Sequence, residues 1–317
     1  MRLCPSDVWL HAAPMYHLVD AFAIYAITAV RGRHVILRQF SPPAALEAIA
    51  RERVTVCNMA TTMMQLVLSN PAASGTDMSS LRVVSCGGSP AAPAVMTSAA
   101  ASFGCEVFQS YGMTETCGKI AMSILPRRGL PCPAAASEGD PPAAEHKRAI
   151  ALVCSSGRPF VLADVRVVGA STGTDILPDS VEIGEVWVRG LSVMRRGYFG
   201  LPESSPFSKG GWFRTGDLAT INGLGYIKVV DRITDMILVG GLNVYSTEVE
   251  ACLLQHPMVD QAAVLGVDNA LLGAVPVAAV VLSTNTIAAP EGGGAERDAA
   301  VRGDVLMLCS EHLSEFK

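Results

Sequence analysis

The sequence predicts an α/β fold in which a mostly parallel sheet with covering helices is followed by a small β-rich subdomain and then by a small α+β domain. Short apolar strands alternate with helical segments through the first third of the chain. From residue 161 the pattern changes to strands separated by turns. The 317 residues are enough for two domains, at roughly 100–200 residues each.

The first third supplies the elements of the parallel sheet. We expect strands at residues 8–11, 34–37, 54–57 and 81–86. Ser41 is placed to cap a helix that has Pro42 at its first position and an apolar stripe through Leu46 and Ile49. A second helix is expected near residues 61–68. This order of strands and helices indicates a buried, parallel arrangement.

The middle of the chain contains an interruption and then the β-rich part. Residues 126–150 are rich in Pro, Ala and charge and show no period, which predicts a surface insertion. Strands are expected at 161–168, 185–189, 218–221 and 226–230. Asn222-Gly223 separates the last two, and this dipeptide is a strong hairpin signal.

A domain boundary is expected near residues 231–235, which predicts one domain at 1–233 and another at 234–317. Beyond the boundary we expect a strand at 236–239, a glycine pair, and a helix opened by a capping box at Thr247. Strands at 261–267 and 277–282 and a last helix to residue 316 complete this domain.

Composition excludes several classes of protein. A net charge of −5 argues against a nucleic-acid partner. The most apolar stretches, residues 21–30 and 270–282, are shorter than the roughly 18–20 residues of a transmembrane helix, so no transmembrane segment is expected. Nine scattered cysteines without a CxxC pair fit free thiols in a reducing compartment, which predicts an intracellular, cytoplasmic location.

Two segments at strand ends have the residue types of a nucleotide site. Residues 85–90 (SCGGSP) follow a strand, and paired glycines let the backbone approach a flat ligand closely, although an ordinary strand-to-helix turn has the same pattern. Residues 109–116 (QSYGMTET) set a hydroxyl beside a carboxylate. One Glu together with a substrate phosphate is enough to hold Mg²⁺, which keeps several waters; the plain alternative is a turn followed by a Thr N-cap.

Two later segments add groups that suit a sugar and a phosphate. In residues 211–218 (GWFRTGDL), Asp217 is expected in a glycine-bounded turn, where a carboxylate accepts both hydroxyls of a ribose. In residues 231–250, Arg232 is a permanent cation with a fork geometry suited to phosphate and ribose oxygens. Taken singly, these residues also fit an ordinary turn and a surface ion pair.

In this order and spacing, the segments closely resemble the AMP-forming acyl-CoA synthetases of the adenylate-forming superfamily. Residues 111–116 are similar to the family's fifth core motif, 211–217 to the seventh, 231–250 to the eighth, and 11–17 (HAAPMYH) to the fourth, which lines the acyl pocket. The resemblance runs from about residue 7 to the end, apart from two low-complexity insertions. It implies that residues 1–233 are the later part of the large adenylate-forming domain and that 234–317 are the small C-terminal domain.

The resemblance implies ATP, Mg²⁺ and coenzyme A as ligands and ATP-dependent formation of an acyl-AMP, followed by thioester formation. Thr114 and Glu115 are the implied catalytic pair, with Thr114 bonding the α-phosphate and Glu115 holding Mg²⁺. The implied nucleotide-binding residues are Gly87, Gly88, Ser89, Pro90, Gln109, Ser110, Tyr111, Gly112, Thr114, Asp217 and Arg232.

Further roles follow from the same resemblance. His17 matches the residue beside the acyl carboxylate, where it need not act as a base because that carboxylate is already ionised at neutral pH. Gly240 and Gly241 match the glycines along which the pantetheine arm of coenzyme A passes. Thr234 occupies the hinge position, where the family usually has Asp or Lys. The expected substrate is a fatty or aromatic carboxylic acid.

Two parts of the family pattern are not present in these 317 residues: a Ser/Thr/Gly-rich phosphate loop before residue 7 and a lysine after residue 317. We therefore expect a chain truncated at both ends, with impaired adenylation, because donors aimed at the developing charge usually supply the largest catalytic effect. Two alternatives stay open. One is an inactive remnant that binds a nucleotide or a protein, and the other is an adenylation domain that loads a carrier protein.

Overall fold

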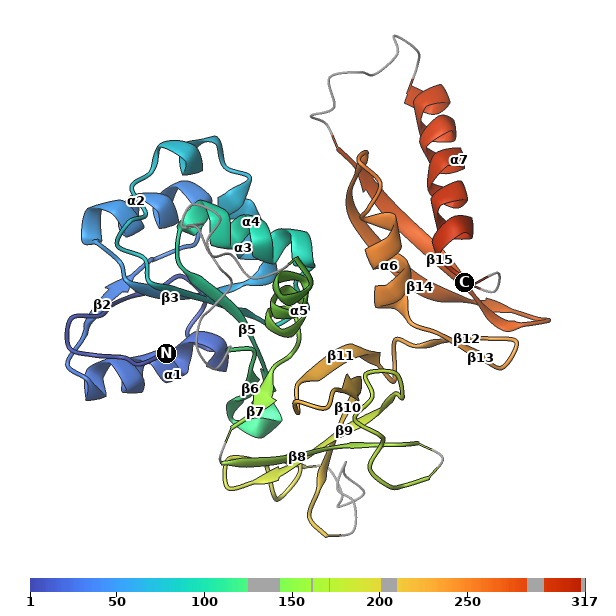
Figure 1. Cartoon of the computed structure of the whole chain (residues 1–317), viewed down its shortest axis with the longest axis horizontal. Helices are drawn as coiled ribbons and strands as arrows, with labels where there is room; N and C mark the ends of the chain where they lie inside the picture. Colours follow the sequence, from blue (N-terminus) through green and yellow to red (C-terminus); the bar gives the residue numbers. More distant parts are fainter. Residues whose placement is uncertain (125–142, 161, 171, 201–209, 284–293, 315–316) are drawn as a thin grey trace. The chain divides into compact units, whose positions relative to one another are not determined.

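The computed structural model describes residues 1–124, 143–160, 162–170, 172–200, 210–283, 294–314 and 317 (Figure 1). The chain divides into two compact units. The first comprises Met1–Thr215 and Thr220–Val229, and the second comprises Gly216–Ala219 and Val230–Lys317. In the described residues, no helix combines the length and the apolar character needed to cross a membrane.

The first unit is built on a seven-stranded sheet with the order β2-β1-β3-β4-β5-β6-β7. Its first five strands are parallel, β6 runs antiparallel to β5, and β7 runs antiparallel to β6. The strands are β1 (Val8–His11), β2 (Arg33–Ile36), β3 (Val56–Ala60), β4 (Val83–Gly87), β5 (Glu106–Met113), β6 (Gly118–Met122) and β7 (Arg158–Pro159). The prediction of a mostly parallel sheet is confirmed.

Helices cover both faces of this sheet, as Figure 1 shows with α1 on one side and α2, α3 and α4 on the other. Alternating residues of the strands supply the two cores. Leu10, Cys57 and Val84 belong to the cluster on the side of α2, α3 and α4, whereas Trp9 and Val56 belong to the cluster on the side of α1. The helices are α1 (Leu18–Ala29), α2 (Pro42–Glu52), α3 (Thr61–Leu68), α4 (Pro93–Phe103) and α5 (Ala143–Val153), with 3₁₀ turns η1 (Pro71–Gly75) and η2 (Thr114–Thr116).

A second sheet follows, with the order β11-β10-β9-β8. Its strands are β8 (Ala163–Val168), β9 (Gly184–Gly190), β10 (Phe213–Ile221) and β11 (Ile227–Arg232). The predicted turn at Asn222-Gly223 is confirmed. The Asn222 side chain accepts hydrogen bonds from the backbone N–H groups of Leu224 at 2.9 Å and Tyr226 at 3.0 Å, which is how an Asn side chain stabilises a turn.

The C-terminal elements form a four-stranded antiparallel sheet with the order β13-β12-β15-β14 and two helices. Val244, Val249, Leu253, Val264 and Val305 are buried together between the sheet and the helices. The elements are β12 (Ile237–Val239), β13 (Leu242–Val244), β14 (Val259–Asn269), β15 (Gly273–Leu282), α6 (Ser246–Leu253) and α7 (Gly294–His312). The small α+β fold predicted for this region is confirmed.

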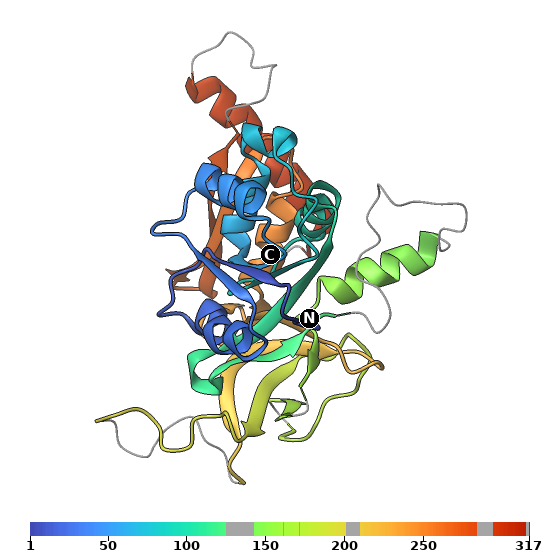
Figure 2. The same ribbon diagram turned by 90° about the vertical axis from the view of Figure 1, so that its left-hand side faces the viewer.

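Two local predictions are wrong, and a third segment is more regular than expected. The predicted surface insertion at 126–150 ends in helix α5, whose residues 147 and 148 are exposed and whose last residue, Val153, is buried in the first core (Figure 2). Residues 125–142 of that insertion lie outside the described residues. Asp217 lies within strand β10 and not in a turn. Thr247 makes no capping box, because its hydroxyl donates to the carbonyl of Val230 instead.

Candidate active site

The ends of β4 and β5 lie side by side and bring two of the predicted segments together. Gly87, the last residue of β4, is paired with Ser110 of β5. A Cβ at Gly87 would lie 2.8 Å from the Ser110 hydroxyl oxygen, so only glycine fits between these strands. Because both strands are parallel, their carboxyl ends open at the same edge of the sheet, where ligands bind in open α/β folds.

The turn after β4 is exposed and is held from beneath. Gly88 has a φ of +93°, a conformation that L side chains rarely adopt, and Gly88, Ser89 and Pro90 are exposed. The Thr61 hydroxyl donates to the Ser89 carbonyl at 3.0 Å. The turn therefore presents backbone to solvent in a fixed shape.

Gln109 and Ser110 are buried in β5, and their side chains are engaged within the protein. Gln109 accepts from the backbone N–H of Ala91 at 3.0 Å and donates to the Cys154 carbonyl at 2.8 Å. The Ser110 hydroxyl donates to the Cys86 carbonyl at 3.1 Å. Both side chains shape the wall of the site in these contacts.

Strand β5 extends to Met113, so most of the segment 109–116 lies within the strand. Tyr111 is half-buried and Gly112 is exposed. A Cβ at Gly112 would lie 2.0 Å from the Gly118 carbonyl oxygen, so glycine is required for the close approach of β6. Thr114 is exposed and begins the 3₁₀ turn directly after β5.

Glu115 is half-buried and is held at two points. Its carboxylate accepts a hydrogen bond from the Tyr198 hydroxyl at 2.8 Å, and its carbonyl accepts from the backbone N–H of Met194 at 2.7 Å. The hydrogen bond to Glu115 raises the pKa of Tyr198 above its ordinary value. Sequence reasoning did not find Tyr198, because no motif links it to a residue 83 positions earlier.

Glu115 suits Mg²⁺ better than a metal with all-protein ligands. No group of three or more His, Cys, Asp or Glu side chains that could hold a metal occurs in the part of the chain that the structure describes. Mg²⁺ is usually held by one or two carboxylates together with substrate phosphates and water. A single half-buried carboxylate directly after an exposed threonine fits that coordination.

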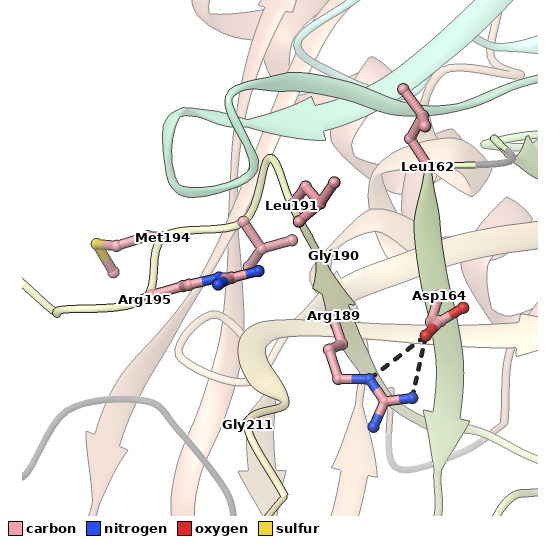
Figure 3. Close-up of a pocket in the computed structure, with 9 residues that line it drawn as sticks. Leu162, Asp164, Arg189, Gly190, Leu191, Met194, Arg195 and Gly211 are labelled. Atoms are coloured by element: carbon pink, nitrogen blue, oxygen red, sulfur yellow. Dashed lines mark hydrogen bonds and ion pairs between the residues drawn. The ribbon is translucent and has the colours of Figure 1, made fainter.

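An open cavity of about 610 Å³ lies beside this segment, where it is lined by Met194, Arg195 and residues of β8 and β9. Figure 3 shows Arg189 of β9 pointing at Asp164 of β8, and the two side chains are joined at 3.0 Å. The Arg189 guanidinium also lies 4.5 Å from the centre of the Trp212 ring. The sequence did not predict this cavity, and none of the predicted site residues lines it.

His17 belongs to the segment 11–17, near the start of the first unit. It is the N-cap residue of α1, is exposed, and stacks obliquely on Tyr16 with ring centres 4.4 Å apart. Its carbonyl accepts from the backbone N–H groups of Asp20 and Ala21, which begins the helix. The ring is thus available to a ligand at the start of α1.

Asp217 and Arg232 form an ion pair within the second unit. The Arg232 guanidinium lies 3.2 Å from the Asp217 carboxylate, and the exposed fractions of the two side chains are 66% and 5%. The neighbouring Asp231 is buried and accepts from the backbone N–H of Ser246 at 2.6 Å. These two neighbours therefore differ in kind: Asp231 is structural, whereas Arg232 faces solvent.

The remaining predicted residues lie on turns of the second unit. Gly240 and Gly241 make the two-residue turn between β12 and β13, with φ values of +56° and +87°, which suits paired glycines in a hairpin. No heavy atom lies within 4 Å of a Cβ built at Gly241. Thr234 is exposed, and its hydroxyl donates to the Asp235 carboxylate at 2.9 Å.

Comparison with known families gives two matches. Residues 1–199 match the sequence model described as "AMP-binding enzyme". Residues 248–317 match the one described as "AMP-binding enzyme C-terminal domain".

Individual proteins agree with these matches. The chain is 37% identical to a feruloyl-CoA synthase from Amycolatopsis sp over 88% of its length and 52% of that protein. It is 32% identical to a 2-succinylbenzoate–CoA ligase from Bacillus pumilus over 100% of its length and 56% of that protein. The structure of O-succinylbenzoate coenzyme A synthetase from Bacillus subtilis, in complex with ATP and magnesium ion, matches with a TM-score of 0.74 and 29% identity, over 100% of this chain and 57% of that one. The chain spans about half the length of the relatives it matches.

Proposed function

The chain belongs to the family of AMP-binding enzymes, and we propose from this premise that the protein activates a carboxylic acid with ATP and passes the acyl group to coenzyme A. The observation that supports the proposal most is the edge of the first sheet. There, the exposed Gly88 turn lies beside the strand that leads into Thr114 and Glu115. A flat base against the turn and a phosphate at Thr114 would occupy adjoining positions on that edge.

The proposed reaction has two steps. An oxygen of the acid carboxylate attacks the α-phosphorus of ATP, and the bond to pyrophosphate breaks. The sulfur of coenzyme A then attacks the acyl carbonyl carbon, AMP leaves with the electron pair of the broken bond, and the thiol proton goes to solvent. Fatty and aromatic acids are the proposed substrates, with His17 beside the reacting carboxylate.

The nucleotide roles divide between side chains and backbone. Thr114 donates to the α-phosphate, which its exposed hydroxyl at the end of β5 allows. Gly87, Gly88, Ser89 and Pro90 border the adenine, and Tyr111 with Gly112 forms the opposite wall. Gln109 and Ser110 hold both walls through their buried hydrogen bonds. Glu115 holds Mg²⁺, which neutralises charge on the phosphates when bound.

The second unit contributes the proposed sugar and thiol contacts. Asp217 accepts from the ribose hydroxyls, and Arg232 contacts the ribose and phosphate from its exposed position beside Asp217. The Gly240–Gly241 turn leaves open space for the pantetheine arm. Thr234 is the proposed hinge residue. We also propose an intracellular, cytoplasmic location, because the described cysteines have free thiols.

The metal role of Glu115 gives a direct test by calorimetry of ATP binding with and without Mg²⁺. The wild-type chain should bind ATP more tightly with Mg²⁺, and the variant Glu115→Gln should lose that difference. Glu47→Gln is the matched control, since Glu47 lies on the surface of α2 and pairs with Arg51. An unchanged Mg²⁺ effect in Glu115→Gln would contradict the assignment.

A further inference from the structure

A polar cluster lies under α1, on the face of the sheet that also holds the apolar side chains of Trp9 and Val56. Asn58 of β3 and Ser85 of β4 are paired in register and completely buried. The Ser85 hydroxyl donates to the Asn58 side-chain oxygen at 2.5 Å, and the Lys119 ammonium of β6 donates to the same oxygen at 2.7 Å. One acceptor atom thus serves two donors.

The second polar atom of the Asn58 amide has no partner. Its Nδ2 is buried and makes no hydrogen bond, in a protein where the other buried side-chain polar atoms of the described residues are satisfied. The orientation of the amide follows from Lys119, since an ammonium can only donate and must face the oxygen. A buried donor without an acceptor is destabilising, so an acceptor supplied by a ligand would stabilise this position.

The Lys119 ammonium also lacks an ion-pair partner among the described residues. Within the described residues, no carboxylate lies within ion-pair distance of its ammonium, which instead sits 4.5 Å from the centre of the Phe22 ring. Burial lowers the pKa of Lys119 to about 7, although Asp20 opposes this effect. Asp20 is engaged elsewhere, because it accepts from Trp9 and from His11. An anion bound at Lys119 would stabilise the charged form.

This cluster adjoins the start of α1, where His17 lies. Lys119 follows Glu115 by four residues, and its neighbour Gly118 approaches Leu18, the first residue of α1, with 3.6 Å between a Cβ built at Gly118 and the Leu18 Cβ. His17, the proposed neighbour of the reacting carboxylate, caps that same helix. Lys119 and Phe22 are only half-buried, whereas Asn58 and Ser85 form the closed floor.

We propose that Lys119 and Asn58 recognise a second carboxylate at the far end of the acid substrate, so that the protein selects dicarboxylic acids over monocarboxylic acids. One oxygen of that carboxylate accepts from the Lys119 ammonium and the other from the unpartnered Asn58 Nδ2. The inference rests on the proposed function for the position of the reacting carboxylate. The anion site itself rests only on the contacts of Lys119 and Asn58.

Direct binding to the 317-residue chain tests the proposal with defined probes. Calorimetry in the presence of AMP should give a tighter dissociation constant for one member of an aliphatic diacid series (succinate, adipate, suberate, sebacate) than for the monoacid of equal length. A charged hydrogen bond corresponds to a preference of about tenfold to a hundredfold. Equal affinities for diacids and monoacids throughout the series would overturn the proposal.

Variants separate recognition from folding. Lys119→Met should remove the diacid preference while leaving monoacid affinity within about twofold, and Lys119→Arg should retain part of it. Lys228→Met is the matched control, because Lys228 is an exposed lysine on β11 of the same unit. Should Lys119→Met not fold, Asn58→Leu, which removes the unpartnered donor, should still lower the preference. A preference that survives in the folded variants contradicts the proposal.

A failure of the anion site and a failure of the proposed function give different results. Diacid binding that depends on Lys119, without any acyl transfer to coenzyme A, supports the anion site and contradicts the activity. Acyl transfer from monoacids and diacids alike, unaffected by Lys119→Met, supports the activity and overturns the anion site.

Discussion

The Gln109 side chain accepts a hydrogen bond at 3.0 Å from the backbone N–H of Ala91 and thereby ties the turn after β4 to β5. Both partners are buried. The same amide donates to the carbonyl of Cys154, the residue that follows α5. One side chain thus fixes the exposed Gly88 turn from below, and we regard it as the main support of the proposed adenine site.

Replacing Gln109 by alanine should therefore cost both stability and nucleotide affinity. The buried Ala91 N–H and the half-buried Cys154 carbonyl lose their partner, and an unsatisfied buried group costs about 1–3 kcal/mol. We expect the free energy of unfolding in urea to fall by about 2 kcal/mol or more, and AMP to bind more weakly in calorimetry. Gln65→Ala is the control, because Gln65 is exposed on α3 and should change stability by less than about 0.5 kcal/mol. A wild-type stability for Gln109→Ala would refute this account of the turn.

The ionisation of Asp7 should make the free energy of unfolding depend on pH. Burial alone would raise its pKa, but hydrogen bonds from Arg82, from the Cys4 N–H and from Thr55 outweigh burial and lower the pKa to about 2. The folded-state pKa lies below the value of 3.8 for an unperturbed Asp. The stabilisation is therefore complete above about pH 4 and is lost as the pH falls through about 2.

The variant Asp7→Asn should consequently be less stable than wild type by about 2 kcal/mol at pH 7, and the gap should close toward pH 2. Urea unfolding at pH 7, 4 and 2.5 measures this gap. Asp77→Asn serves as the comparison, since Asp77 pairs with Arg53 on the surface and such pairs contribute about 0–1 kcal/mol. A gap for Asp7→Asn that is constant across this range contradicts the role of ionised Asp7.

Asp231 and Arg232 are neighbours whose alanine variants should behave in opposite ways. Asp231→Ala removes the buried acceptor for the Ser246 N–H and hydroxyl at the start of α6, and should lower the stability of the second unit by about 2 kcal/mol. Arg232→Ala removes an exposed guanidinium and should change stability by no more than about 1 kcal/mol. It should weaken AMP binding by about tenfold or more. Urea unfolding and AMP calorimetry together decide, and the reverse ranking would contradict both assignments.

Local signals predicted several elements well. Helix α3 has the predicted bounds, and Ser41 caps α2 by accepting from the Ala44 N–H at 3.3 Å. Helix α1 gave no signal of its own, because apolar residues such as Ile24 and Tyr25 are exposed while Ala23 and Ile27 are buried, which leaves no clear period. The Thr247 prediction failed because its hydroxyl found a tertiary partner in Val230, and no local pattern reports such a contact.

The residues of the candidate site also include some that local sequence predicts and some that depend on tertiary structure. Motif spacing identifies Thr114 and Glu115, since these residues are adjacent in the chain. The contacts Tyr198–Glu115 and Asn58–Lys119 depend on the tertiary fold, which brings together residues that are 83 and 61 positions apart. A sequence without its topology gives no indication of either pair, and nothing in the motifs distinguishes Gln109 as a support from Gln109 as a ligand contact.

Acyl transfer to coenzyme A is measured most directly when the acyl-AMP intermediate is supplied preformed. Purified chain is mixed with hexanoyl-AMP or benzoyl-AMP and coenzyme A, and the thioester is quantified by chromatography. We expect thioester formation well above the chain-free rate. Gly241→Leu should lose it while retaining AMP binding, whereas Gly303→Leu, at an exposed glycine of α7 with open space around it, should not. Thioester formation no faster than without the chain would contradict the proposed function.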